Sequence, residues 1–340
     1  MRFRTSLTFT SAILAAGLAL SACGVSAEED SSSAGGSTAA AGPVTGLRIL
    51  VPNSPGSGYD QTARAAAKAM QDAKLANTIE VFNAAGAGGT VGLQRLVNEK
   101  GADDILMQMG LGVVGAVYTN GSDALVSDMT PIARLIEEQE GLVVPADSPF
   151  KTVDDFVQAW QDDPGSITIG GGSTNGGPDH LFPMQLATAV GVDPRELRYV
   201  VYDGGGPLTT ALLGNKIDVG FSGVGEFEGP LSSGELRLLA VSGEERLKGE
   251  GISESPTLTE AGIDLVFTNW RGVFAPPGIS DERRDELIAM LEEMHDTPEW
   301  KQALEDNGWI DEFKTGDEFT TFLQEQDERV ATTLEELDLL

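Results

Sequence analysis

The stretch LRILVPNSPGSGYD, residues 47–60, predicts a strand, a loop and the start of a helix in direct succession. Leu47–Val51 is a short apolar run typical of a buried strand. The Gly- and Pro-rich positions that follow predict a loop, and Asp60 can cap a helix that continues to Met70. Because glycine carries no side chain, the backbone of such a loop can come close to another group. The stretch therefore predicts a βα unit with an accessible loop.

The same unit recurs twice more along the chain. The Gly-rich loop 83–90 follows an apolar run at 78–82 and precedes a helical pattern at 91–98. The loop 171–179 lies between an apolar run and a helical pattern in the same way. In a parallel sheet such loops gather at the carboxyl ends of the strands, and the helix N-termini offer free N–H groups to an anion. Three such loops favour a binding cleft over three unrelated tight turns.

Alternation of strands and helices continues to the end of the chain and predicts an α/β fold with largely parallel strands. Further strands are expected at 104–109, 132–136, 141–144, 167–170, 198–201, 219–222, 236–241, 265–267 and 272–275. Further helices are expected at 153–161, 181–190, 208–213, 281–295, 299–306 and 317–336. These elements form two βα series, which predicts two similar lobes.

The N-terminus, residues 1–22, is predicted to be a lipoprotein signal peptide. Arg2 and Arg4 precede an apolar run, from Leu7 to Leu20, that is too short to cross a bilayer. The run ends in Leu-Ser-Ala-Cys, so Cys23 is expected to be acylated, with palmitate as one of the chains. An ordinary signal peptide with an incidental cysteine is the alternative. Residues 23–46 are rich in Ser, Ala and Gly and predict a disordered tether.

The formal net charge of -31 at pH 7 narrows the choice of partners. A phosphate backbone would be repelled, so a nucleic-acid partner is excluded. Any anion site must be built locally, from backbone N–H groups or a few arginines. Cys23 is the single cysteine of the chain, so disulfides and thiol chemistry are excluded as well. We predict no metal site and no cofactor.

Enzyme signatures are weak in this sequence. Gly110–Gly115 reads GLGVVG, which matches a dinucleotide fingerprint but does not lie in the first βα unit. There is no GxSxG nucleophile elbow and no GxxxxGK[ST] phosphate loop. His180 and His295 are the only histidines, so a catalytic triad is hard to assemble. We predict a binding protein and not an enzyme, with a hydrolase built on paired carboxylates as the weaker alternative.

Five stretches resemble, in order and spacing, the tripartite tricarboxylate transporter substrate-binding family, also called TctC-like or Bug receptors. They are VPNSPGSGYDQTAR at 51–64, GAGGTVG at 86–92, GGPDH at 176–180, YDGGG at 202–206 and NWRGVFAPPG at 269–278. The resemblance extends over the body of the chain, from Leu47 onward. The combination of the five stretches is more specific than any one of them.

The resemblance implies a type II periplasmic-binding fold, in which two α/β lobes enclose a ligand cleft. Lobe 1 would comprise residues 47–145 and 268–340, and lobe 2 residues 146–267. Backbone N–H groups of two loops would grip one carboxylate of the ligand. The residues implied for the first loop are Gly56, Ser57, Gly58, Tyr59 and Asp60, and for the second Ser173, Thr174, Asn175 and Gly176. The rest of the cleft would be lined by Gly86, Ala87, Gly88, Gly89, Asp203, Gly204 and Ser222.

Four residues outside these loops were also considered. Three of them have two interpretations each, and His295 has only a structural one. Arg64 lies four positions after Asp60, which predicts an ion pair on the helix surface, with contact to a ligand carboxylate as the alternative. Arg271 is expected either at a hinge or in the cleft. His180 is expected to pack at a helix end, with a ligand role as the alternative. His295 is expected on a solvated helix face.

The function that the resemblance implies is that of an extracytoplasmic solute-binding lipoprotein, monomeric and anchored by its lipid to the cell membrane. It would capture a small di- or tricarboxylate for the membrane subunits of a tripartite tricarboxylate transporter. A ligand sensor that signals to a membrane kinase is the alternative, because it would use the same fold. The lobes are expected to close about hinge strands near Val144 and Phe267. Asn53 replaces an aromatic and Ser57 a glycine of many relatives, which makes this wall more polar.

Overall fold

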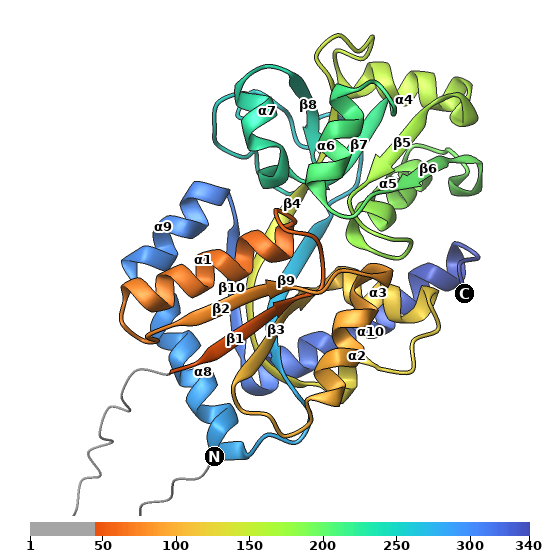
Figure 1. The fold of residues 1–340 in the computed structure, drawn as a ribbon. Coiled ribbons are helices and arrows are strands. Elements are labelled where there is room, and N and C mark those ends of the chain that lie inside the picture. Colours follow the sequence, from red (N-terminus) through yellow and green to blue (C-terminus); the bar gives the residue numbers. More distant parts are fainter. Residues whose placement is uncertain (1–44) are drawn as a thin grey trace, which may run out of the picture. The chain divides into compact units, whose positions relative to one another are not determined.

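The computed structural model describes residues 45–340, so the predicted signal peptide, Cys23 and nearly all of the predicted tether lie outside the described residues. Strand β1 (Leu47–Val51) is almost entirely buried, as its apolar sequence predicts. It lies parallel between β2 (Ile79–Asn83) and β3 (Ile105–Gly110). The helices that follow these strands are α1 (Gly58–Asp72), α2 (Thr90–Asn98) and α3 (Leu111–Thr119). These elements form the first lobe (Figure 1).

A second group of strands repeats this arrangement. Strand β5 (Thr168–Gly171) lies parallel between β6 (Arg198–Val201) and β7 (Val219–Gly223). The helices of this second lobe are α4 (Val153–Asp162), α5 (Pro178–Ala189), α6 (Gly205–Leu213) and the short α7 (Glu228–Ser232). Single turns of 3-10 helix lie at Ala87–Gly89, Val126–Asp128, Pro164–Ser166, Pro194–Glu196 and Val224–Phe227.

Strand β4 (Thr130–Pro145) runs from one lobe into the other. Its first part pairs antiparallel with β9 (Thr268–Ala275) and β10 (Ile310–Thr315). Its second part pairs antiparallel with β7 and β8 (Leu236–Val241). The resulting strand order is β2-β1-β3-β9-β4-β7-β5-β6. The α/β class with two lobes is therefore confirmed. Strands β1–β3 and β5–β7 form parallel groups, whereas β4, β8, β9 and β10 make antiparallel pairs.

The prediction of two strands at 132–136 and 141–144 is wrong, because β4 is continuous. The polar run Glu137–Glu140 resembles a break between strands. In the fold, Arg134 bonds to Glu137 at 2.9 Å, while Arg271 and Asn269 bond to Glu138, so the sheet can hold these carboxylates. The partners of Glu138 come from β9 and could not be identified locally.

One further strand prediction is wrong, the disfavoured dinucleotide match proves to be the start of a helix, and one strand was not expected. Residues 265–267 are not a strand, although the Phe267 N–H donates to the Ser242 carbonyl at 2.8 Å. Gly110–Gly115 does not form a nucleotide loop, because Leu111 and the residues after it form the buried helix α3. Strand β10 was not expected, since its sequence IDEFKT is largely charged and half-buried.

The C-terminal helices complete the first lobe. They are α8 (Asp281–His295), α9 (Pro298–Asn307) and α10 (Gly316–Glu336). Helices α8 and α9 pack against α1, and α10 packs against β4 and β10. The aromatic rings of Trp270, Phe274 and Phe319 lie within 5.4–6.4 Å of one another and join β9 to α10. Within residues 45–340, no helix combines the length and the apolarity needed to cross a bilayer.

Candidate ligand cleft

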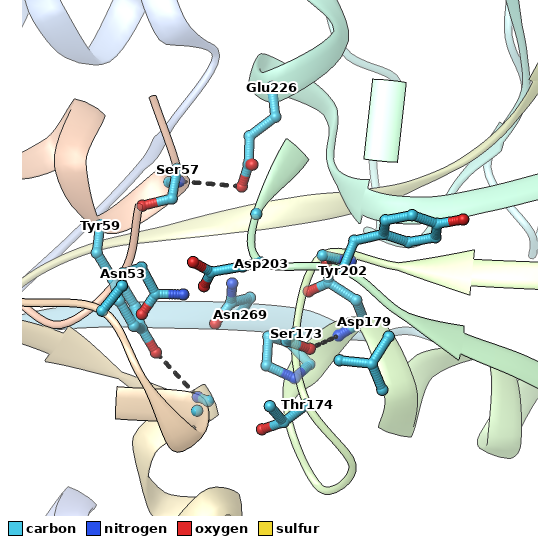
Figure 2. A pocket seen from close by; sticks show the side chains of 18 of the residues that line it. Asn53, Ser57, Tyr59, Ser173, Thr174, Asp179, Tyr202, Asp203, Glu226 and Asn269 are labelled. Atoms are coloured by element: carbon cyan, nitrogen blue, oxygen red, sulfur yellow. Dashed lines mark hydrogen bonds between the residues drawn. The ribbon is translucent and has the colours of Figure 1, made fainter. Parts of the chain in front are cut away.

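A cavity of about 490 Å³ lies where the loops of the two lobes meet (Figure 2). Its walls are formed by the loops after β1, β2, β5 and β6 and by the start of β9. Because β1 and β2 belong to the first lobe and β5 and β6 to the second, both lobes contribute to one site. This is the gathering at strand ends that the Gly-rich loops predict.

Ten of the predicted ligand-binding residues line this cavity. They are Ser57, Gly58, Tyr59, Gly86, Ala87, Gly88, Ser173, Thr174, Asp203 and Gly204. Six predicted residues do not line it, namely Gly56, Asp60, Gly89, Asn175, Gly176 and Ser222. Ser57 and Thr174 therefore face the same space, from opposite lobes. The other six support the loops that line it.

Asp60, in the first turn of α1, supports the β1–α1 loop through hydrogen bonds. Its carboxylate accepts from the Gly56 N–H at 2.9 Å, from Arg64 at 2.9 Å and from Asn83 at 3.0 Å. Burial raises the pKa of Asp60, but these three hydrogen bonds outweigh it and the net pKa is lowered. The helix cap is Ser57 and not Asp60, which lies in the first turn. The surface ion pair predicted for Arg64 is confirmed.

The residues Asn175, Gly176 and Ser222 hold the second-lobe loop in place. Thr119 of α3 donates to the Asn175 carbonyl at 2.9 Å. A Cβ built on Gly115 would lie 1.8 Å from the Gly176 carbonyl oxygen. This separation is possible only because position 115 has no side chain. The buried Ser222 hydroxyl counteracts part of the rise that burial causes in the pKa of Asp179.

Eleven lining residues were not in the predicted set. They are Asn53, Ala85, Gly112, Gly172, Pro178, Asp179, Val201, Tyr202, Glu226, Asn269 and Arg271. Most are neighbours of predicted loops, and Arg271 had a cleft role as one of its two interpretations. Glu226 was not predicted, although Gly223, Gly225 and Gly229 lie beside it around the turn after β7.

Arg271 is buried, with 2% of its side chain exposed, and it supports the first loop. Its Nη1 donates to the Gly58 carbonyl at 2.9 Å and to the Thr62 hydroxyl at 3.1 Å. Its Nη2 bonds to Glu138 and lies 3.8 Å from Glu226 Oε1. A Cβ on Gly58 would lie 1.8 Å from Nη2. A larger residue at position 58 would therefore displace Arg271 as well as narrow the cleft.

Four buried acids surround this arginine. Burial raises the pKa values of Glu138, Glu140, Asp179 and Glu226, and their mutual repulsion raises those of the three glutamates further. Both carboxylate oxygens of Glu140 are buried without a hydrogen-bond partner. Carboxylates in such surroundings retain protons to a higher pH than they do in water. Among residues 45–340, no group of His, Cys and acidic side chains is arranged to hold a metal ion.

The Glu226 carboxylate links the two lobes. Its Oε1 accepts from the Gly58 N–H at 3.1 Å, and its Oε2 accepts from the Gly205 N–H at 2.5 Å. Gly58 and Gly205 are the first residues of α1 and α6, so this carboxylate bridges two helix N-termini. Burial raises the pKa of Glu226 to about 8, even though Arg271 and the Gly205 N–H favour the ionised form.

The two histidines have structural positions. His180 Nδ1 accepts from the Gly176 N–H at 3.3 Å, and its ring meets Tyr199 edge-on. Burial lowers the pKa of His180 to about 4, so the ring is neutral at pH 7. The prediction of helix-end packing is confirmed. The prediction of a solvated face for His295 is confirmed only in part, because the side chain is 24% exposed but its ring stacks on Phe313 with centroids 4.4 Å apart and bonds to Asp311.

The family model described as "Tripartite tricarboxylate transporter family receptor" matches residues 62–339. The chain belongs to this family. It is therefore a substrate-binding receptor and not an enzyme, as the sequence predicted.

This receptor has a similar curated relative in Cupriavidus necator, a UPF0065 protein that is 28% identical over 78% of this chain and 79% of the relative. Two solved structures share its fold. MatC from Rhodopseudomonas palustris with bound malate is 23% identical, with a TM-score of 0.74 over 86% of this chain and 99% of that chain. A second R. palustris protein with adipate is 20% identical, with a TM-score of 0.78 over 87% and 98%.

Proposed function

We propose that this receptor is an extracytoplasmic lipoprotein that captures a small di- or tricarboxylate for the membrane subunits of a tripartite tricarboxylate transporter. The observation that carries the proposal is the convergence of Gly-rich loops from both lobes on one cavity. The first-turn N–H groups of a helix have no partner inside the helix. Those that open α1 border the cavity at Ser57–Tyr59, and the loop that leads into α5 borders it at Ser173 and Thr174.

Several properties favour a carboxylate as the ligand. A cavity of about 490 Å³ suits a small metabolite. The helix N-termini favour negative charge, because the partial positive ends of the helix dipoles point at the cavity. Malate and adipate, which the two R. palustris proteins hold, are both dicarboxylates.

Capture would proceed by closure of the two lobes on the ligand. We propose lobe 1 as residues 47–145 and 268–340, and lobe 2 as residues 146–267. A ligand that contacts Ser57 and Thr174 together binds the closed form better than the open one, so it shifts the population toward closure. The closed receptor would then be the form that the membrane subunits recognise.

A thermal-shift screen tests whether the ligand of this receptor is a carboxylate. Malate, succinate, adipate and citrate are each added to the purified protein, and the matching dimethyl or trimethyl esters serve as controls. At 100 times its Kd, a true ligand stabilises the folded state by about 2.7 kcal/mol. For about 300 folded residues, with an unfolding entropy of about 2.1 cal/mol/K per residue, that corresponds to a rise in Tm of roughly 4 °C. Equal stabilisation by an acid and its ester would contradict a carboxylate site.

Acylation at Cys23 would hold the receptor on the extracytoplasmic face of the membrane, as a monomer. Two or more acyl chains make such anchoring stable, since each buried CH₂ contributes about 0.8 kcal/mol. The test is fractionation of cells that express the native chain or Cys23→Ser. We expect the native chain in the membrane fraction and the variant in the soluble fraction. Membrane retention of the variant would refute the anchor.

A further inference from the structure

The Glu226 carboxylate is held jointly by both lobes. Glu226 lies in the turn after β7, in the second lobe, and accepts there from the Gly205 N–H at 2.5 Å. Its other oxygen accepts from the Gly58 N–H of the first lobe at 3.1 Å and lies 3.8 Å from Arg271. Figure 2 shows the carboxylate directed at the loop that carries Ser57. Each lobe therefore supplies part of the surroundings of this one carboxyl group.

The first lobe also covers Glu226 and excludes water from it. The side chain of Glu226 is 7% exposed. The β1–α1 loop lies against the loop before α6, since a Cβ built on Gly204 would lie 2.9 Å from the Cβ of Ser57. If the lobes separate, Ser57, Gly58 and Arg271 move away from Glu226, and water takes their place. The exposure of this carboxyl group thus differs between a closed and an open receptor.

Three more acids lie around Glu226, at the end of β7. Glu140 lies opposite Gly223 in the pairing of β4 with β7. Glu138 packs against the same glycine, since a Cβ built there would lie 2.6 Å from Glu138 Oε1. Asp179, in the first turn of α5, is the third acid whose charge acts on this group. All three are buried, so water screens their repulsion of Glu226 only weakly.

Positive charge is scarce in these surroundings. Among the described residues that line the cavity, Arg271 is the one cation, and it bonds to Glu138 while it lies farther from Glu226. Four buried carboxylates cannot all stay ionised around one guanidinium, so the closed site retains protons. The pKa of about 8 that burial gives Glu226 agrees with this. The titratable residues next in the chain to Glu226 or to its two N–H donors include no cation; they are Tyr59, Asp60, Asp203 and Glu228.

We propose that the receptor takes up a proton at Glu226 when its lobes close on a ligand, so that this carboxyl group couples ligand capture to pH. In the open receptor Glu226 faces water, where a glutamate is ionised at neutral pH. In the closed receptor its carboxyl group is protonated, and its oxygens still accept from the Gly58 and Gly205 N–H groups. This inference rests on the closure that belongs to the proposed function.

The direction of the pH dependence follows from the difference in pKa between the two forms. The pKa of Glu226 is about 8 in the closed receptor, against an ordinary value of 4.5 in water. A bound proton therefore favours the closed form below pH 8, and this contribution is lost as the pH rises through 8. Because only the closed form holds a ligand from both sides, affinity should be about tenfold higher at pH 7 than at pH 9.

Isothermal titration calorimetry of the purified receptor tests the proposal, with malate, succinate and adipate as the probes. Each titration is run at pH 7 in PIPES and in Tris, whose enthalpies of ionisation differ. The difference between the two observed enthalpies gives the number of protons that binding takes up. We expect about one proton per bound dicarboxylate in the native protein. This measurement needs no variant.

Two substitutions assign the proton to its residue. Glu226→Gln keeps the size of the side chain and one acceptor oxygen but cannot titrate. Binding to this variant should take up no proton, and its affinity should be the same at pH 7 and pH 9. Glu228→Gln is the matched control, because Glu228 lies two residues away, is exposed and does not line the cavity. It should behave as the native protein does.

The outcomes separate this inference from the function on which it rests. Proton uptake that Glu226→Gln removes and Glu228→Gln preserves supports it. If a dicarboxylate binds to the native protein without proton uptake, the coupling is refuted and the carboxylate receptor stands. Uptake that survives in Glu226→Gln refutes the assigned residue. If none of the three dicarboxylates binds, and the thermal-shift screen also fails, the proposed function is refuted together with the closure that this inference requires.

Discussion

Replacement of Arg271 by methionine is expected to lower the free energy of unfolding by about 3–5 kcal/mol. Methionine fills a similar volume but leaves the buried Glu138 carboxylate, the acid closest to the guanidinium, without its cation. It also removes the hydrogen bonds that hold the Gly58 carbonyl and the Thr62 hydroxyl. Urea unfolding at pH 7, followed by circular dichroism, measures the change as a lower midpoint with an unchanged m-value.

A second substitution identifies the cause of this loss. Glu138→Gln combined with Arg271→Met removes the acid closest to the lost cation, so the double variant should recover part of the stability. Arg134→Met is a matched comparison, because Arg134 is equally buried but bonds to Glu137 and Glu312 outside the cavity. If the free energy of unfolding falls by less than about 1 kcal/mol in Arg271→Met, the buried acids around position 271 are already neutral. Arg271 then serves mainly to support the β1–α1 loop.

The pH dependence of stability follows from the same cluster. The folded-state pKa of Glu226 is about 8 against an ordinary value of 4.5, so between these values the folded protein binds more protons than the unfolded chain. The free energy of unfolding therefore falls as pH rises through this window, by at most about 1.4 kcal/mol per pH unit from this group. In Arg271→Met the buried acids should stay protonated to a higher pH. The fall in the free energy of unfolding should therefore extend above pH 8. In Glu226→Gln the free energy of unfolding should depend less on pH than it does in the native protein.

Replacement of Gly115 by alanine is expected to weaken ligand binding by about 100-fold or more while the fold stays intact. The added Cβ would lie 1.8 Å from the Gly176 carbonyl oxygen, which is backbone and cannot rotate away. The loop that carries Ser173 and Thr174 must then move away from α3. In the proposed open form α3 and this loop separate, which relieves the conflict, and alanine favours helix α3 by about 0.5–1 kcal/mol over glycine. Affinity and stability should thus change in opposite directions.

Calorimetry with the tightest ligand of the screen measures the affinity, and small-angle scattering measures closure. With saturating ligand the native protein should become more compact, and Gly115→Ala should not. Gly229→Ala is the control, because no atom lies within 4 Å of the added Cβ. Native affinity in Gly115→Ala would mean that contact between α3 and the second-lobe loop is not needed for binding.

Local sequence was sufficient for the features that depend on neighbouring residues. Apolar runs such as Leu47–Val51 predicted the buried strands, and glycine-rich stretches predicted the loops that meet at the cavity. Both signals are local, because strand burial follows side-chain type and tight loops need residues without side chains. The resemblance of five stretches to one receptor family supplied the fold class and the family.

Only the tertiary structure revealed the charged centre of this protein. Glu138, Asp179, Glu226 and Arg271 come from β4, α5, the turn after β7 and β9. The sequence marked Arg271 as a cleft or hinge candidate but did not indicate that these four groups meet. The continuity of β4 through its acidic run, and the engagement of the Gly58 N–H by Glu226, depend on the same long-range contacts. A buried charge is tolerated only where an opposite charge or a hydrogen-bond donor lies within a few ångströms, and chain folding alone decides which groups come that close.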